Sequence, residues 1–166
     1  RTLAVTMGLT PSPFDCWLAE RGLATFALRH DRAQANAAAL ADFVAAQPGV
    51  ARVLYPSRPD HPDHNRAMAI LGGQGGNMLS FVLAGGRTAA NALTAAMPDV
   101  AFAPTLGDVG TTLSHPPTSS HRALTPEGRA VLGITEGFFR VSVGIEDIGL
   151  LKADFARGIA AAAAVS

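Results

Sequence analysis

Arg140 has the residue type and the place in the sequence that most need a chemical explanation. It lies within the apolar run 138–144, which reads as a β-strand. A guanidinium cannot lose its charge at ordinary pH, so placing it in an apolar strand is costly unless it is paired. An acidic side chain of the protein or the carboxylate of a ligand could form that pair, because the planar fork of arginine suits both. Glu146 and Asp147 follow the strand and are the internal candidates, so the residues alone leave both alternatives open.

The segment 60–64, Asp-His-Pro-Asp-His, also contains groups that can bind a metal. Zinc enzymes usually hold two histidines on a rigid helix and take a third ligand from elsewhere, whereas this segment is a loop interrupted by proline. We therefore favour a solvated or helix-capping loop over a metal site at His61 and His64. His115 and His121 flank a Pro-Pro-Thr-Ser-Ser segment and likewise lack the spacing of a known metal site.

Three further features could bind phosphate or act as nucleophiles, and each favours a structural explanation. Residues 72–76, Gly-Gly-Gln-Gly-Gly, are followed by a strand, whereas a phosphate-binding loop leads into a helix. Cys16 lies beside Trp17 in an apolar helix, which predicts a buried and unreactive thiol. The one lysine, Lys152, lies one step off the apolar face of the last helix, so we expect it to be solvated rather than to form a Schiff base.

The composition excludes several classes of protein. With 166 residues, 48% hydrophobic and 16% charged, the chain can bury a sizeable single core. Thirteen basic and thirteen acidic residues cancel, so no net field attracts nucleic acid or an anionic membrane. The apolar stretches are shorter than the roughly 20 residues of a membrane-spanning helix, and a single cysteine cannot form an internal disulfide. These features predict a cytoplasmic domain. Because residue 1 is arginine and Met7 lies inside an apolar run, we expect it to be part of a longer chain.

Hydrophobic spacing predicts one helix and then alternating short strands and helices. Gly22 should end the first helix, and the stretch 104–126 is expected to be irregular. Together these elements predict an α/β fold of two layers, in which helices cover a small, antiparallel or mixed sheet. The expected helices span 14–19, 26–47, 67–71, 87–96, 126–132 and 147–163, and the expected strands 50–55, 77–83, 100–103 and 138–143.

Seven short motifs, in order and covering nearly the whole chain, resemble those of one enzyme family. They are SPFDCWLAERGL at 12–23, Asn-Ala at 36–37, VLYP at 53–56 with His-Pro at 61–62, GNMLSF at 76–81, TLGD at 105–108, HPPTSSH at 115–121 and RVSVGIED at 140–147. Together they resemble the Cys/Met-metabolism family of pyridoxal-phosphate enzymes. That family comprises cystathionine synthases and lyases, methionine γ-lyase and the O-acylhomoserine sulfhydrylases.

The resemblance implies the carboxy-terminal part of a fold type I enzyme. Residues 1–25 would end the large cofactor-binding domain, and residues 26–166 would form the small domain, which begins with a long bridging helix. The family's Schiff-base lysine and its other contacts to pyridoxal 5'-phosphate belong to the amino-terminal part, so this chain alone should be inactive. The full enzyme is expected to be a cytoplasmic homotetramer, a dimer of dimers. It would catalyse γ-elimination or γ-replacement on methionine, cystathionine or an O-acylhomoserine.

The resemblance also implies which residues contact the substrate. Arg140 matches the arginine that binds the α-carboxylate of the amino acid, and Thr105 takes the place of a serine beside that carboxylate. The backbone of Thr105 and Leu106 would complete the site. Pro104 stands where enzymes acting at the γ-carbon of cystathionine tend to have glutamate, which favours methionine or an O-acylhomoserine as substrate. The alternative is a non-catalytic module that binds a small carboxylate or serves assembly.

Overall fold

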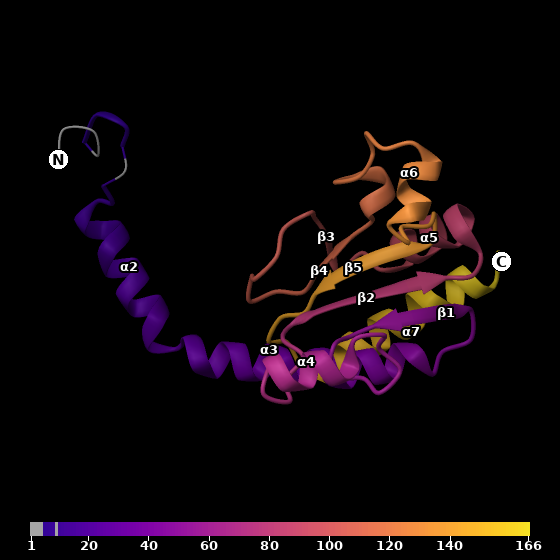
Figure 1. Cartoon of the computed structure of the whole chain (residues 1–166), viewed down its shortest axis with the longest axis horizontal. Coiled ribbons are helices and arrows are strands. Elements are labelled where there is room, and N and C mark those ends of the chain that lie inside the picture. The colour runs from indigo at the N-terminus through magenta and orange to yellow at the C-terminus, as the bar shows by residue number, and fades with distance from the viewer. Residues whose placement is uncertain (1–4, 9) are drawn as a thin grey trace.

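The chain folds as a five-stranded sheet covered on one face by helices (Figure 1). The computed structural model describes residues 5–8 and 10–166, and within them the strand order is β1-β2-β5-β4-β3. Pairing is antiparallel except between β3 and β4, which confirms the expected α/β fold with a mixed sheet. The elements are α2 (Pro13–Ala24), α3 (Phe26–Ala45), β1 (Val50–Leu54), α4 (His64–Ile70), β2 (Met78–Leu83), α5 (Gly86–Ala96), β3 (Ala101–Phe102), β4 (Thr112–Ser114), η1 (Pro116–Thr118), α6 (Pro126–Val131), β5 (Phe138–Ser142) and α7 (Ile148–Ala163).

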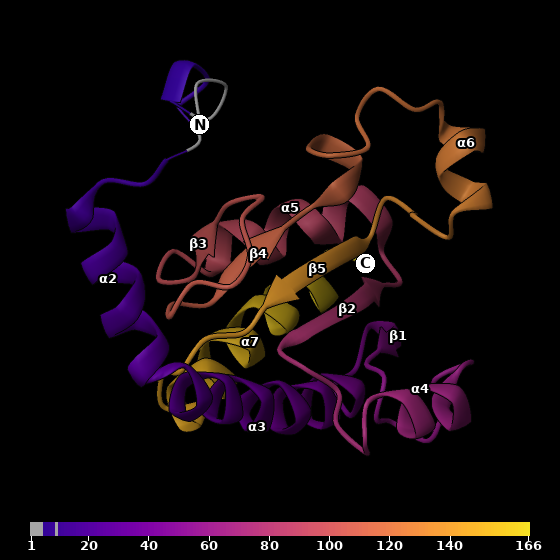
Figure 2. The same ribbon diagram turned by 60° about the vertical axis from the view of Figure 1, so that its left-hand side comes forward.

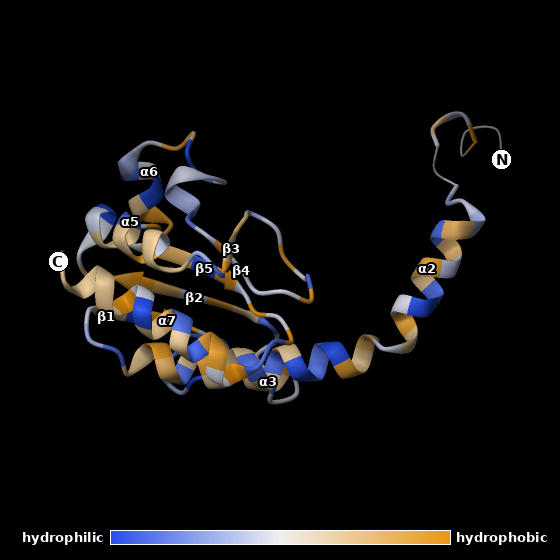
Figure 3. Ribbon diagram, turned by 180° about the vertical axis from the view of Figure 1, so that it is seen from behind, coloured by the Kyte–Doolittle hydropathy of each residue, from blue (hydrophilic) through white to orange (hydrophobic). Residues whose placement is uncertain are grey.

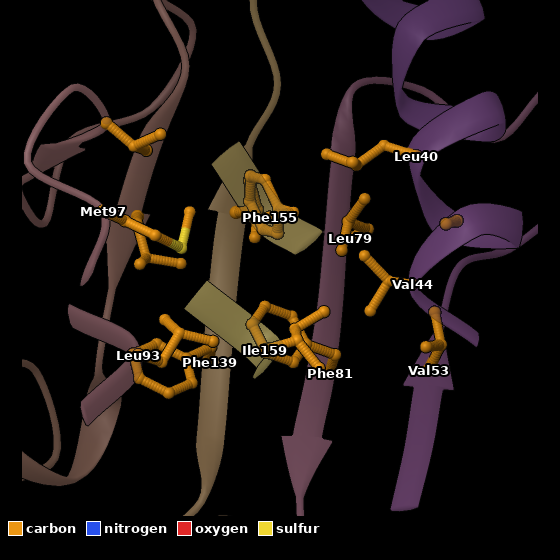
Figure 4. Close-up of a cluster of buried hydrophobic side chains, with 14 of the residues drawn as sticks. Leu40, Val44, Val53, Leu79, Phe81, Leu93, Met97, Phe139, Phe155 and Ile159 are labelled. Carbon is orange, nitrogen blue, oxygen red and sulfur yellow. The ribbon is translucent and has the colours of Figure 1, made fainter. Parts of the chain in front are cut away.

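The two central strands, β2 and β5, give the sheet a core face and an opposite face. Side chains alternate along a strand, so residues two apart point to the same side. Phe81 and Phe139 are opposite each other in the register and are fully buried, with ring centroids 5.3 Å apart. Phe155 of α7 meets Phe81 edge-on at 6.1 Å, and Figure 4 shows these rings packed between the sheet and the helix.

Helices α3, α5 and α7 supply the other side of the core, as the view from behind shows (Figure 3). In α3, residues at three- and four-residue steps are buried: Ala33, Ala37, Leu40 and Val44. Leu151, Phe155 and Ile159 of α7 are buried as well. No helix in residues 5–8 and 10–166 combines the length and apolar character needed to cross a bilayer.

Helix α2 extends away from the sheet and contributes no buried residue to the fold (Figures 1 and 2). Ser12 and Asp15 form a capping box at its start, and Arg29 donates to the Gly22 carbonyl oxygen at 2.9 Å across the break at Thr25. Gly22 does not end the helix, contrary to expectation, because α2 continues to Ala24. Cys16 is exposed rather than buried, since no other element of the described residues covers it.

The stretch 104–126 is more ordered than the sequence indicated. It contains the three-residue strand β4, all of which is buried, and the 3-10 helix η1. Because β4 begins with threonine and ends with serine, it has no apolar run that would predict a strand, although Leu113 is buried in the core. This strand brings the segment before it alongside β5, where the candidate site lies.

Candidate functional site

Arg140 lies in the middle of β5, the central strand, and points away from the helices. Its neighbours Phe139 and Val141 are fully buried on the core face, so the alternation along the strand directs Arg140 to the opposite face. Ser80 of β2 and Ser114 of β4 are its partners in the register. Arg140 is therefore a half-buried cation flanked by small polar residues on both neighbouring strands.

The hydrogen bonds of Arg140 lead to backbone oxygens and not to carboxylates. Its Nη2 atom donates to the carbonyl oxygens of Pro104, at 3.3 Å, and Thr105, at 3.5 Å. Within the described part of the chain, Arg140 forms no ion pair, and its Nε and Nη1 groups have no hydrogen-bond partner. A guanidinium has five N–H donors, so most of this fork remains available to a ligand.

The two acidic residues that could have neutralised Arg140 have other partners. The carboxylate of Glu146 accepts hydrogen bonds from the backbone N–H of Thr111 and, at 3.0 Å, from its hydroxyl. Asp147 caps α7, where its Oδ1 accepts from the N–H of Gly149 at 2.8 Å and of Leu150 at 3.2 Å. Of the two alternatives left open by the sequence, the internal ion pair is therefore absent from the described residues.

Thr105 and Leu106 lie on the connection between β3 and β4, residues 103–111, which we call the β3–β4 loop. The carbonyl oxygen of Thr105 accepts a hydrogen bond from Arg140 and a second one, at 3.1 Å, from the Thr112 hydroxyl. Leu106 is the next residue along and is 62% exposed. The structure thus brings Arg140 and Thr105 together, with Leu106 adjacent on an open surface.

Sequence reasoning did not identify the residues that hold this loop. Ser142, 1% exposed, accepts from the N–H of Gly107 at 2.9 Å, and Thr112 and Glu146 bind the loop at Thr105 and Thr111. A serine within an apolar strand and a glutamate just after it were visible signals. Their partners lie about 35 residues away in sequence, however, and only the register of β4 against β5 brings them close.

The histidines have structural contacts. In the 60–64 segment, the Nδ1 of His61 accepts from the N–H of Asp63 at 3.1 Å, just before α4. His115 is buried, and its two ring nitrogens contact the Glu136 carbonyl oxygen and the Thr118 hydroxyl, each at 2.9 Å. Burial lowers the pKa of His115. Among the described residues, no group of three or more His, Cys, Asp or Glu side chains is arranged to hold a metal ion.

The remaining candidates also have structural explanations. Gly75 packs against the ring of Tyr55, which a Cβ at that position would overlap, and the glycine-rich turn leads into β2. Lys152 is half-buried rather than fully solvated, with Nζ 5.8 Å from the ring centroid of Phe43. It lies on α7, which covers the core face, whereas Arg140 points from the opposite face.

This arrangement does not fit pyridoxal phosphate within the described residues. A cofactor held as a Schiff base needs a lysine beside the group that binds the substrate, and the single lysine is on the other side of the sheet. The glycine-rich turn also precedes a strand, so it presents no helix N-terminus to a phosphate. The geometry fits a small carboxylate, which arginine binds through two parallel hydrogen bonds.

Comparisons with known proteins place the chain in one family. A sequence model described as "Cys/Met metabolism PLP-dependent enzyme" matches residues 1–160. An O-succinylhomoserine sulfhydrylase of Pseudomonas aeruginosa is 46% identical over 156 residues, which are 94% of this chain and 38% of that protein. An L-methionine gamma-lyase of Pseudomonas putida is 40% identical over 156 residues, 94% of this chain and 39% of that protein.

A solved structure shares the fold over nearly the whole length of the chain. Cystathionine gamma synthase from Xanthomonas oryzae pv. oryzae, in complex with aminoacrylate and cysteine, superposes with a TM-score of 0.85 at 37% identity. The match covers 97% of this chain and 41% of that one, so the chain spans about two fifths of the length of these relatives. The match to the family model, nearly end to end, shows that this chain belongs to the Cys/Met metabolism family of PLP-dependent enzymes.

Proposed function

We propose that this chain is the carboxy-terminal portion of a pyridoxal-phosphate-dependent lyase or sulfhydrylase and that it binds the α-carboxylate of the amino acid substrate. Arg140 is the main binding group, and Thr105 and Leu106 form the adjoining wall. The substrate class is methionine, cystathionine or an O-acylhomoserine, on which the full enzyme performs γ-elimination or γ-replacement. The names of the relatives, sulfhydrylase, γ-lyase and γ-synthase, support this class.

The observation that carries the proposal is the state of the Arg140 guanidinium. It is half-buried in the central strand and has no carboxylate partner among the described residues. Its only hydrogen bonds within those residues run from Nη2 to two carbonyl oxygens. A cation in such a place is destabilising unless an anion arrives. A substrate carboxylate meets that need, and two parallel hydrogen bonds would also orient the amino acid for reaction.

The domain assignment follows from the same proposal. Residues 1–25 belong to the large domain and residues 26–166 to the small one; of the former, residues 1–4 and 9 lie outside the described part. The absence of any buried residue in α2 supports this division, because α2 then packs on the large domain. The cofactor is bound outside these 166 residues, so the chain alone is inactive. The full-length protein is a cytoplasmic homotetramer built as a dimer of dimers.

The test is Arg140→Ala in the full-length enzyme containing these residues, supplied with pyridoxal phosphate. Truncating one member of a charge pair costs about 2–5 kcal/mol, which corresponds to a loss of roughly 30-fold to 4000-fold in kcat/KM. Arg52→Ala is the matched control, an exposed arginine on strand β1 of the same sheet. Equal kcat/KM values for R140A and the unmodified enzyme would refute the assignment.

The alternative is a non-catalytic module that holds a small carboxylate or serves assembly. The natural coding sequence separates the two. A preceding region that contains a Schiff-base lysine, and an aldimine absorbance band when cofactor is added to the full-length protein, support the enzyme. A start codon immediately before residue 1 supports the module.

A further inference from the structure

The β3–β4 loop carries Thr105 and Leu106, whereas β5 carries Arg140. The carboxylate site therefore requires that the loop keep a fixed position relative to β5. The loop residues 104–109 are exposed, and β3 is only two residues long. Exposed loops of this kind are conformationally free unless specific contacts hold them. Side chains from β5 and from the turn after it supply such contacts at two separate points.

The first point is Ser142, which lies two residues along β5 from Arg140 on the same face. Its Oγ accepts from the N–H of Gly107 at 2.9 Å and from the amide nitrogen of Asn77 at 3.4 Å. Gly107 has a φ of +80°, a conformation that favours glycine. The hydrogen bond fixes the backbone directly after Thr105 and Leu106 to the strand that holds the guanidinium.

The second point is Glu146, just beyond the end of β5. Its carboxylate binds both the N–H and the hydroxyl of Thr111, which is 4% exposed, at the far end of the loop. The N–H of Ile145 donates to the Val109 carbonyl oxygen at 2.9 Å. A Cβ on Gly144 would overlap that same oxygen, so the loop lies directly against the turn that carries Glu146.

We propose that Ser142 and Glu146 are positioning residues for the carboxylate site, holding the β3–β4 loop against β5 so that Thr105 and Leu106 face Arg140. This inference rests on the proposed function, because it concerns the same site. Neither side chain touches the bound carboxylate. Both act through the loop backbone, and their loss loosens the wall of the site while Arg140 stays in place. Substrate binding is therefore affected more than the chemical step.

The experiment compares Ser142→Ala and Glu146→Ala in the full-length enzyme with pyridoxal phosphate bound. The substrate is whichever of O-succinyl-L-homoserine, L-methionine or L-cystathionine the unmodified enzyme converts. We expect KM to rise about fivefold or more, the equivalent of one lost hydrogen bond, with kcat within about twofold. Thr94→Ala is the control, because its hydroxyl bonds only within α5, to the Ala90 carbonyl oxygen at 2.9 Å. It should leave both constants unchanged.

A second measurement does not depend on activity. Hydrogen exchange of the peptide spanning 104–111, followed by mass spectrometry in the cofactor-free protein, should be faster in both alanine variants and unchanged in T94A. Glu146→Gln keeps an oxygen for the N–H of Thr111, so its exchange and its KM should lie closer to the unmodified protein than those of E146A. If S142A does not fold, the pair E146A and E146Q decides, because Glu146 is only half-buried.

The outcomes separate this inference from the function on which it rests. Equal kcat/KM values for Arg140→Ala and the unmodified enzyme overturn the carboxylate site itself. A lowered kcat/KM in R140A, with an unchanged KM in both S142A and E146A, overturns the positioning role and leaves the site. Unchanged exchange at 104–111 in both variants also overturns it, since the loop is then held by other contacts.

Discussion

Asn36 is the buried amide that joins α3 to the turn after β5, and its removal provides a quantitative test of the fold around the site. Only 2% of Asn36 is exposed, and its Nδ2 donates to the carbonyl oxygens of Gly144, at 3.0 Å, and Glu146, at 2.8 Å. Each hydrogen bond contributes about 1 kcal/mol, and leaving a buried carbonyl unpaired adds to the loss. Asn36→Ala should therefore lower the free energy of unfolding by about 2–3 kcal/mol.

Urea denaturation followed by circular dichroism measures the effect. With a slope of about 2 kcal/mol per molar urea, the midpoint should fall by roughly 1–1.5 M. Asn36→Asp should be worse than alanine at neutral pH, because it directs a carboxylate at two carbonyl oxygens. Gln47→Ala is the control just beyond the end of the same helix, where the side chain makes one local hydrogen bond to the Phe43 carbonyl oxygen at 3.1 Å. It should cost less than about 0.5 kcal/mol.

Two results would contradict this role of Asn36. If N36A unfolds within about 0.5 kcal/mol of the unmodified protein, the amide does not hold the turn. If N36D is more stable than N36A, the side chain at position 36 does not act as a hydrogen-bond donor to these carbonyl oxygens.

Two further predictions concern pH and close packing. Burial lowers the pKa of His115, so the folded protein binds fewer protons than the unfolded chain in mild acid; stability should fall as the pH drops from about 6.5 through the lowered pKa. Urea titrations at several pH values should show this fall in the unmodified protein and its absence in His115→Gln. Gly144→Ala should destabilise the protein by about 1–3 kcal/mol, because the new Cβ overlaps the Val109 carbonyl oxygen. A midpoint of urea unfolding equal to that of the unmodified protein would contradict this contact.

The part of the fold that depends on apolar periodicity could be predicted from the sequence. Hydrophobic spacing located the helix α3, and the apolar runs of β2 and β5 located the two central strands. Strand β4 was missed because its burial comes from pairing with β5 rather than from an apolar composition. The exposure of Cys16 could not be foreseen either, since a helix pattern does not tell whether another element covers it.

The candidate site was predictable only at its charged centre. A guanidinium in an apolar strand is conspicuous, and Arg140 is where the sequence indicated. The contacts that complete the site are backbone oxygens and hydroxyls, and these groups occur at so many positions that residue type alone does not select among them. The bonds from Gly107 to Ser142 and from Thr111 to Glu146 each join residues 35 apart in sequence, and they become visible only once the strand register is known.

The central place of β5 divides the site into two parts of unequal stiffness. Strands β2 and β4 pair with β5 on both sides, so displacing Arg140 would require opening the middle of the sheet and, with it, the core. The wall opposite the guanidinium depends on a handful of contacts and can shift by itself. Under the proposed function, ligands that share an acid group but differ beyond it would be accommodated by a change in the β3–β4 loop, while Arg140 stays in place.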